Sequence, residues 1–415
     1  MKNMATLRYL PLICLALMHT VVDTSALLIE PLWPLLERSF ALTGVAALSI
    51  ALILQSLPTS LSQAVFGYLR DARKTPGILW IGPLLAVICL TTMGLAESRA
   101  VLCVLIVLGG IGVGAFHPEA AVAAGQAFPG QRTRGLSLFM FGGSLGLGLG
   151  PLLSGAIVDR WGLPGLSYAA LPMAVCVVLL WKIGRLGALV GSMPVPHGHA
   201  GFGGALERRW GTALAVLLVC SLRLVPNMAM AKVISFEMSR RHYGTFAIGQ
   251  TQSLFLVAAS VGMFVMAFRF RSGWERAFMI YCPLAGIPLL LILGMHDCPL
   301  WLFIATLIPT GLILWGTSPA MVSYAQQLFP RGAGLASAIT MGLSWGLGGL
   351  IQAPFTAHFQ KMGAPYQAFH AFIPCLLLAA VGAWLLPRVQ TEAESSSPQP
   401  IQPEVAPVQA EFGDR

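Results

Sequence analysis

The chain has 415 residues, of which 56% are hydrophobic and only 10% are charged, and its mean hydropathy is +0.76. This composition excludes an ordinary soluble globular domain and indicates an integral membrane protein. The formal net charge of +9 could suggest a nucleic-acid partner, but the positions of the basic residues give it a different meaning.

Apolar runs of about 20 residues, long enough to cross a hydrocarbon core about 30 Å thick, recur along the chain. Twelve are predicted, near residues 9–36, 44–69, 76–96, 100–127, 132–158, 165–186, 210–236, 245–269, 276–296, 299–328, 332–358 and 366–387. The sequence therefore predicts an all-α membrane protein with twelve transmembrane helices in two pseudo-symmetric six-helix bundles.

The longest polar interruption sets the domain boundaries. Residues 1–186 are predicted to form the first bundle, 187–209 a cytoplasmic linker and 210–387 the second bundle. The remaining residues, 388–415, are rich in Pro, Glu, Ser and Gln, so we expect a disordered cytoplasmic tail.

The basic residues indicate the orientation in the membrane. With a cytoplasmic amino terminus, 17 of the 25 lysines and arginines lie on the cytoplasmic side, six lie outside, and Arg223 and Lys232 fall within spans. This bias follows the positive-inside rule and places both termini in the cytoplasm. We expect a multi-pass protein of the bacterial inner membrane that functions as a monomer without a nucleic-acid partner.

Other classes of site have little support. The eight cysteines are scattered singly and are interpreted as packing residues. His197 and His199 lie on the predicted linker without further ligands, so no metal site is predicted. The chain has no GxxxxGK[ST] motif, and we expect neither direct ATP use, nor a cofactor, nor enzymatic activity.

An internal repeat relates the two halves. Pro118, Gln126, Phe128 and Pro129 recur as Pro319, Gln327, Phe329 and Pro330, and Gly142, Ser144, Gly146 and Gly148 recur as Gly342, Ser344, Gly346 and Gly348. Such a repeat predicts two bundles related by an axis along the membrane normal, with a site at their interface near the midplane. This arrangement is typical of an alternating-access transporter.

Several segments resemble known families. GYLRDARK at 67–74 resembles the loop signature of the major facilitator superfamily, and Gly146, Gly150, Pro151 and Gly155 resemble the fifth-helix signature of its drug–proton antiporters. FHPE at 116–119 and YAQQLFPRGAGLAS at 324–337 are similar to the fosmidomycin-resistance type of efflux transporter.

The resemblance implies specific roles for these segments. Gly67, Asp71 and Arg73 would close a cytoplasmic gate, and the glycine-rich fifth helix, which also contains Gly142, would pack closely on a neighbouring helix. The corresponding loop of the second half reads MAFRFRSGWERAF and contains no aspartate, so a gate there would need another acid.

Ionisable side chains within spans are functional candidates because burying them is costly. His19 and Asp23, four residues apart, share one helix face, and Glu30 returns to that face two turns later. Proton exchange requires a carboxylate that changes its charge, and Asp23 is the first candidate, Glu119 the second and Glu30 the third. His117 is interpreted either as a proton carrier or as a neutral hydrogen-bond partner.

A cavity between the bundles is predicted to bind the substrate. The repeat places Asp23 and Arg223 at similar depth on opposite walls, where they either pair with each other or are each satisfied within their own half. Four neutral residues are predicted to line the cavity and contact the substrate, although each could equally serve helix packing: Asn227, Trp315, Ser318 and Tyr324.

Together these patterns predict a secondary transporter that exports a small polar or anionic compound in exchange for protons. Proton symport or facilitated uptake of a metabolite is the alternative within transport. A receptor or scaffold without transport is a more remote interpretation.

Overall fold

The computed structural model describes residues 2–72, 76–126, 132–192, 206, 208–269, 274–329, 335–336 and 338–388. Every regular element in these ranges is a helix. This follows from the solvent, because a chain that crosses lipid must satisfy its backbone hydrogen bonds internally, and a single helix does so.

The first bundle consists of six long helices and several short ones. They are α1 (Lys2–Leu27), η1 (Glu30–Leu32), α2 (Trp33–Ser39), α3 (Gly44–Ala72), α4 (Ile78–Thr92), η2 (Met93–Leu95), α5 (Arg99–Gln126), α6 (Arg132–Trp161), η3 (Leu163–Ala169), α7 (Ala170–Ile183) and α8 (Leu186–Ser192). The short helix α8 occupies the beginning of the predicted linker, and most of the rest of that linker, with His197 and His199, lies outside the described residues.

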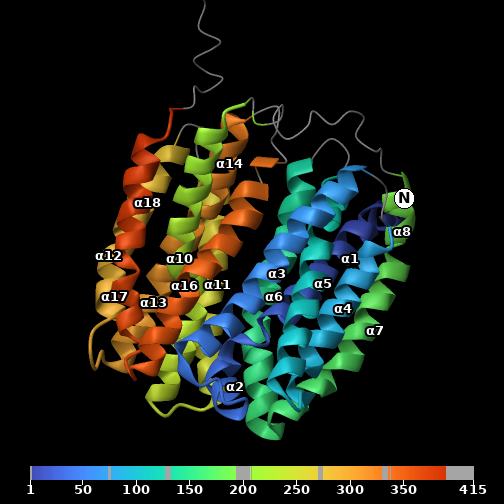
Figure 1. Cartoon of the computed structure of the whole chain (residues 1–415). Coiled ribbons are helices and arrows are strands. Elements are labelled where there is room, and N and C mark those ends of the chain that lie inside the picture. The colour runs from blue at the N-terminus through green and yellow to red at the C-terminus, as the bar shows by residue number, and fades with distance from the viewer. Residues whose placement is uncertain are drawn as a thin grey trace, which may run out of the picture.

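The second bundle repeats this pattern. It contains α10 (Trp210–Arg240), α11 (Thr245–Arg269), α12 (Glu275–Leu293), α13 (Leu300–Gly316), α14 (Ser318–Leu328), the π-helix η5 (Ala338–Leu343), α16 (Ser344–Lys361), α17 (Gln367–Ala371) and α18 (Ile373–Leu385). Figure 1 shows the two bundles side by side, with the start of α1 and the end of α18 at the same end of the molecule.

Eleven helices in the described ranges are long and apolar enough to cross a membrane. The remaining predicted span, 332–358, corresponds to η5 followed by α16. Buried Gln352 and Thr356 add polar groups to this helix. With this helix the twelve predicted spans are accounted for, and the predicted all-α fold is confirmed.

The glycines of α6 determine how closely the first bundle packs. A Cβ atom added at Gly146 would lie 2.5 Å from the Thr20 carbonyl oxygen of α1, and one at Gly150 would lie 2.7 Å from that of Thr24. Gly142 faces the Ala16 carbonyl in the same way. Helix α1 is therefore the close neighbour on this face of α6.

The opposite side of α6 meets the second bundle. A Cβ at Gly155 would lie 2.8 Å from the carbonyl oxygen of Thr245 in α11, and Gly249 of α11 packs against the Pro151 carbonyl. Ser253 of α11 also donates a hydrogen bond of 2.8 Å to the Gly148 carbonyl. Helix α6 thus connects α1 to the second bundle.

Candidate functional site

Three ionisable side chains meet inside the first bundle. The Nε2 atom of His19 lies 3.2 Å from Oδ2 of Asp23, and the Nε2 atom of His117 lies 3.3 Å from Oδ1 of the same carboxylate. The two Nε2 atoms are 3.2 Å apart. Helix α1 supplies His19 and Asp23 and α5 supplies His117, so residues 98 positions apart form one polar cluster.

The other ring nitrogen of each histidine is bound to the backbone. Nδ1 of His19 lies 2.8 Å from the Phe139 carbonyl oxygen of α6, and Nδ1 of His117 lies 2.7 Å from the Val113 carbonyl oxygen of α5. A carbonyl only accepts, so each Nδ1 must carry hydrogen. In the neutral form, each Nε2 is then an acceptor directed at Asp23.

Packing holds this cluster in place. The His19 ring stacks on the Phe139 ring with centroids 4.0 Å apart. Gly143 of α6 lies so close to His19 and Asp23 that a Cβ there would overlap the imidazole. His19 is buried, whereas the side chains of Asp23 and His117 keep 12% and 22% of their surface exposed. The cluster is therefore rigid but still accessible.

Glu119 is fully within the first bundle but is not one of the three groups that converge. It follows His117 by two residues, which places it on another face of α5, and it is 2% exposed.

Arg223 lies in the second bundle and is 2% exposed. Its guanidinium donates to the Leu314 carbonyl at 2.5 Å and to the Ser318 hydroxyl at 3.1 Å, and its Nε has no hydrogen-bond partner. Within the described ranges, no carboxylate forms an ion pair with it. Asp23 is instead paired with the two histidines of the first bundle, whereas Arg223 keeps a buried Nε without a partner, so the two charges do not pair with each other in this structure.

The predicted neutral cavity residues separate into two groups. Asn227 donates to the same Leu314 carbonyl as Arg223, at 3.2 Å, and its Oδ1 has no partner. Trp315 is 5% exposed, and its indole nitrogen also has no partner. Asn227 and Ser318 therefore share hydrogen-bond partners with Arg223, whereas Trp315 packs against the Trp345 ring.

Tyr324 does not join this group. Its hydroxyl donates to the Pro387 carbonyl at 2.9 Å, beyond the end of α18, and its ring is buried in an apolar cluster. The alternative interpretation, helix packing, describes this residue better than a substrate contact does.

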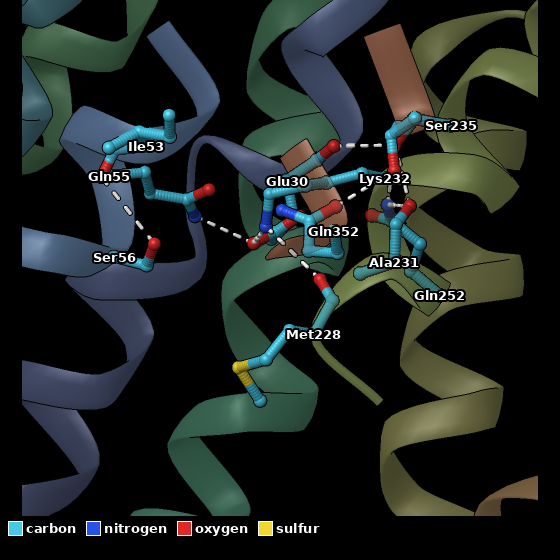
Figure 2. A network of polar contacts seen from close by, with 11 residues as sticks. Glu30, Ile53, Gln55, Ser56, Met228, Ala231, Lys232, Ser235, Gln252 and Gln352 are labelled. Atoms are coloured by element: carbon cyan, nitrogen blue, oxygen red, sulfur yellow. Dashed lines mark hydrogen bonds and ion pairs between the residues drawn. The ribbon is translucent and has the colours of Figure 1, made fainter. Parts of the chain in front are cut away.

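Glu30 forms an ion pair between the bundles, which Figure 2 shows in detail. Its Oε1 lies 3.1 Å from Nζ of Lys232 in α10, and both side chains are 6% exposed. Gln55 of α3 donates to the same oxygen at 2.6 Å, and the Ser235 hydroxyl donates to the Glu30 carbonyl at 2.5 Å. The sequence did not predict Lys232 as the partner of Glu30. The two residues lie 202 positions apart, close to the repeat distance of about 200, so they occupy nearly equivalent positions in the two halves.

Further contacts join the bundles near this ion pair. Glu37 of α2 accepts hydrogen bonds from Gln360 at 2.9 Å and Lys361 at 2.5 Å, both in α16. Arg38 donates to Ser239 of α10 at 3.2 Å. Figure 1 shows α2, which carries Glu37 and Arg38, at the end of the molecule away from the start of α1.

The predicted cytoplasmic gate is only partly described. Gly67 lies in α3, where an added Cβ would be 3.7 Å from Pro118. Asp71 belongs to the last turn of α3, and Arg73 lies outside the described residues. Their gating role therefore remains a prediction.

In the second half, a glutamate occupies the start of α12. Glu275 is 4% exposed and accepts hydrogen bonds from Gln327 at 2.7 Å and Ser323 at 3.1 Å, both in α14. The sequence MAFRFRSGWERAF contains no aspartate, but this glutamate supplies an acid near the same place. A motif defined by aspartate does not detect this glutamate, although it lies within the same segment.

Comparisons with known proteins agree with this architecture. Residues 15–353 match the model of the Major Facilitator Superfamily. The chain is 30% identical over 347 residues to the fosmidomycin resistance protein of Escherichia coli (strain K12), covering 81% of this chain and 83% of the relative. It is 28% identical over 400 residues to the uncharacterized MFS-type transporter YfnC of Bacillus subtilis (strain 168), covering 91% and 93%.

Solved structures share the fold. The D-xylose-proton symporter superposes with a TM-score of 0.74 at 14% sequence identity, covering 92% of this chain and 98% of that protein. An inward-facing, unoccupied bacterial homologue of the lysosomal transporter Spinster gives a TM-score of 0.66 at 16% identity, covering 92% and 97%. At such identities the likeness concerns the fold alone.

Proposed function

The chain belongs to the major facilitator superfamily, and we propose that it exports a small polar or anionic compound across the bacterial inner membrane in exchange for protons. Transport itself follows from the family. Export is supported by the likeness to the fosmidomycin resistance protein of Escherichia coli. The observation that carries proton coupling is the buried cluster of His19, Asp23 and His117.

The geometry of this cluster suits a site that gains and loses a proton. Two imidazole Nε2 atoms and one carboxylate converge, and their Nδ1 hydrogens are already committed to carbonyl groups. A proton placed among the three acceptors would be shared by them, and its loss would leave them mutually repulsive. Asp23, which contacts both rings, is therefore the proposed proton-binding carboxylate. Because His117 lies on α5 and Asp23 on α1, binding or loss of the proton would change the contact between these two helices.

Arg223 supports an anionic substrate. A buried guanidinium without a carboxylate partner in the described ranges retains uncompensated charge, and burial of such a charge is costly. Its Nε, the Asn227 Oδ1 and the Trp315 indole nitrogen lack partners nearby. An anionic group would accept a hydrogen bond from the Arg223 Nε, and a hydroxyl or N–H group of the same compound would donate to the Asn227 Oδ1. A phosphonate is the first class to test, because the relative's name contains fosmidomycin.

The Glu30–Lys232 ion pair, which joins the two bundles, supports alternating access. Glu30 and Lys232 hold the bundles together toward the end remote from the termini. If the positive-inside rule gives the orientation, this is the periplasmic side, and the described conformation is closed there. Glu30 then acts as part of a gate, which is a different role from the third-choice proton carrier.

Glu119 remains the second candidate for the proton, and Gly67, Asp71 and Arg73 remain the proposed cytoplasmic gate. We propose that the protein performs this cycle as a monomer with both termini in the cytoplasm.

The test uses purified protein in liposomes with fosmidomycin as the probe and an imposed pH gradient. Antiport predicts that an opposing proton gradient accelerates substrate flux at least several-fold, and that Asp23→Asn removes this acceleration. Flux that follows the proton gradient in the same direction would indicate symport instead. Flux of the probe that ignores the gradient in both proteins would contradict proton coupling.

A further inference from the structure

We propose that His19, Asp23 and His117 form a binding site for one divalent transition-metal ion, with Zn²⁺ as the best fit. The sequence predicts no metal site, and these three residues share no ligand motif along the chain. The fold brings them together from two helices. It goes beyond the proposed function, since a metal could occupy the site whatever compound is transported.

The separations between the donor atoms fit tetrahedral coordination. The three measured separations are 3.2 Å between the two Nε2 atoms, 3.2 Å from His19 to Asp23 and 3.3 Å from His117 to Asp23. A tetrahedral Zn²⁺ with bonds of about 2.0–2.1 Å holds its ligand atoms about 3.3 Å apart. An ion could therefore bind near the centre of the cluster with little movement of the side chains.

The second shell also matches that of a metal site. Histidines that bind metals usually donate their other ring hydrogen to a carbonyl or carboxylate, which fixes the tautomer and the ring orientation. His19 does so to the Phe139 carbonyl and His117 to the Val113 carbonyl. Both rings therefore present a lone pair at Nε2 to the same point, and Asp23 presents its carboxylate there.

Burial and packing preorganise the site but leave access to it. The His19 ring is fixed between Phe139, at 4.0 Å between centroids, and Gly143 of α6. The exposed fractions of Asp23 and His117, 12% and 22%, leave an approach to the cluster. Three protein ligands with one accessible position are typical of zinc sites that retain a water or an exchangeable ligand.

The ligand types restrict the metal. Two imidazoles and a carboxylate suit late first-row divalent ions, including Zn²⁺ and Co²⁺, better than Mg²⁺ or Ca²⁺, which prefer oxygen ligands. Protons compete for the same atoms, because metal ligands must be deprotonated. The metal would therefore compete with the proposed coupling proton and connect α1 to α5.

Cobalt provides the test, since tetrahedral Co²⁺ absorbs visible light. The full-length protein, purified in detergent without a histidine tag, is titrated with Co²⁺ and then with Zn²⁺. We expect one equivalent of Co²⁺ to give tetrahedral absorption bands that Zn²⁺ removes. His117→Gln and Asp23→Asn should each weaken binding at least tenfold. His296→Asn is the matched control, because His296 and Asp297 form an exposed pair, and it should bind normally.

Folding of each variant is checked by gel filtration and by its melting temperature without metal. Zn²⁺ should raise the melting temperature of the wild type and of His296→Asn, but not that of Asp23→Asn. The proposal is overturned if well-folded wild type shows no tetrahedral bands, or if the bands persist in both His117→Gln and Asp23→Asn. This readout requires no transport, so failure of proton coupling and failure of metal binding are distinguishable.

Discussion

The carboxylate of Glu30 and the ammonium group of Lys232 lie 3.1 Å apart across the boundary between the two bundles, and neither side chain exposes more than 6% of its surface. The pair belongs to a small polar layer with Gln55 and Ser235. A buried ion pair that joins two rigid bodies has to separate when those bodies move apart. Its strength therefore helps to set which conformation of the transporter is preferred.

Neutralising one member of this pair should destabilise the described conformation. Lys232→Met leaves the Glu30 charge buried without its partner, which typically costs about 3–5 kcal/mol. The double variant Glu30→Gln/Lys232→Met should recover much of this loss. Melting temperatures of the purified proteins measure both effects.

The matched comparison is Glu37, whose pair with Lys361 is more exposed. Glu37→Gln should cost about 1 kcal/mol or less, since exposed ion pairs contribute little. Equal losses for Lys232→Met and Glu37→Gln would show that burial of the Glu30–Lys232 pair has no special role.

Replacement of Arg223 should affect anions selectively. Arg223→Gln removes the buried charge, and we expect at least a tenfold loss in affinity for fosmidomycin because charge-assisted hydrogen bonds are lost. Arg223→Lys keeps the charge but cannot donate to both Leu314 and Ser318 in the same geometry, so an intermediate loss is expected. Binding is measured by calorimetry. Unchanged affinity in Arg223→Gln would place the substrate elsewhere.

The close packing of α6 on α1 should not tolerate larger residues. Gly146→Ala would introduce a Cβ 2.5 Å from the Thr20 carbonyl oxygen and 2.8 Å from the Asp23 Cβ. We expect a loss of about 1–3 kcal/mol through overpacking, together with reduced proton-coupled transport. Gly211→Ala, at a position with no atom within 4 Å of the new Cβ, should be neutral or slightly stabilising. Thermal unfolding compares the two, and a Gly146→Ala protein as stable as wild type would argue against this contact.

Glu275 should hold α12 to α14. Glu275→Ala removes the carboxylate that Gln327 and Ser323 share as an acceptor, which should cost about 1–3 kcal/mol and increase hydrogen exchange in α14. Glu97, which is exposed, serves as the control, and Glu97→Ala should leave α14 protected. If exchange in α14 is the same in both variants, Glu275 does not stabilise that end of the second bundle.

The sequence by itself determined the architecture. Each apolar run is long enough to cross the membrane, so the number of runs indicates the number of helices. The repeat of about 200 residues indicates their division into two bundles. The pairing of His19 with Asp23 was also predictable, because residues four apart share a helix face whatever the rest of the chain does.

Tertiary structure decided which groups meet across helices. The sequence does not state how α1, α5 and α10 are rotated about their axes, so it could not place His117 on Asp23 or distinguish an Asp23–Arg223 pair from two separate sites. It also could not show Lys232 against Glu30. Those contacts depend on packing between helices, to which the glycines of α6 contribute where they lie against α1. A membrane protein's hydropathy pattern specifies where its helices cross, whereas side-chain packing specifies which of their faces touch.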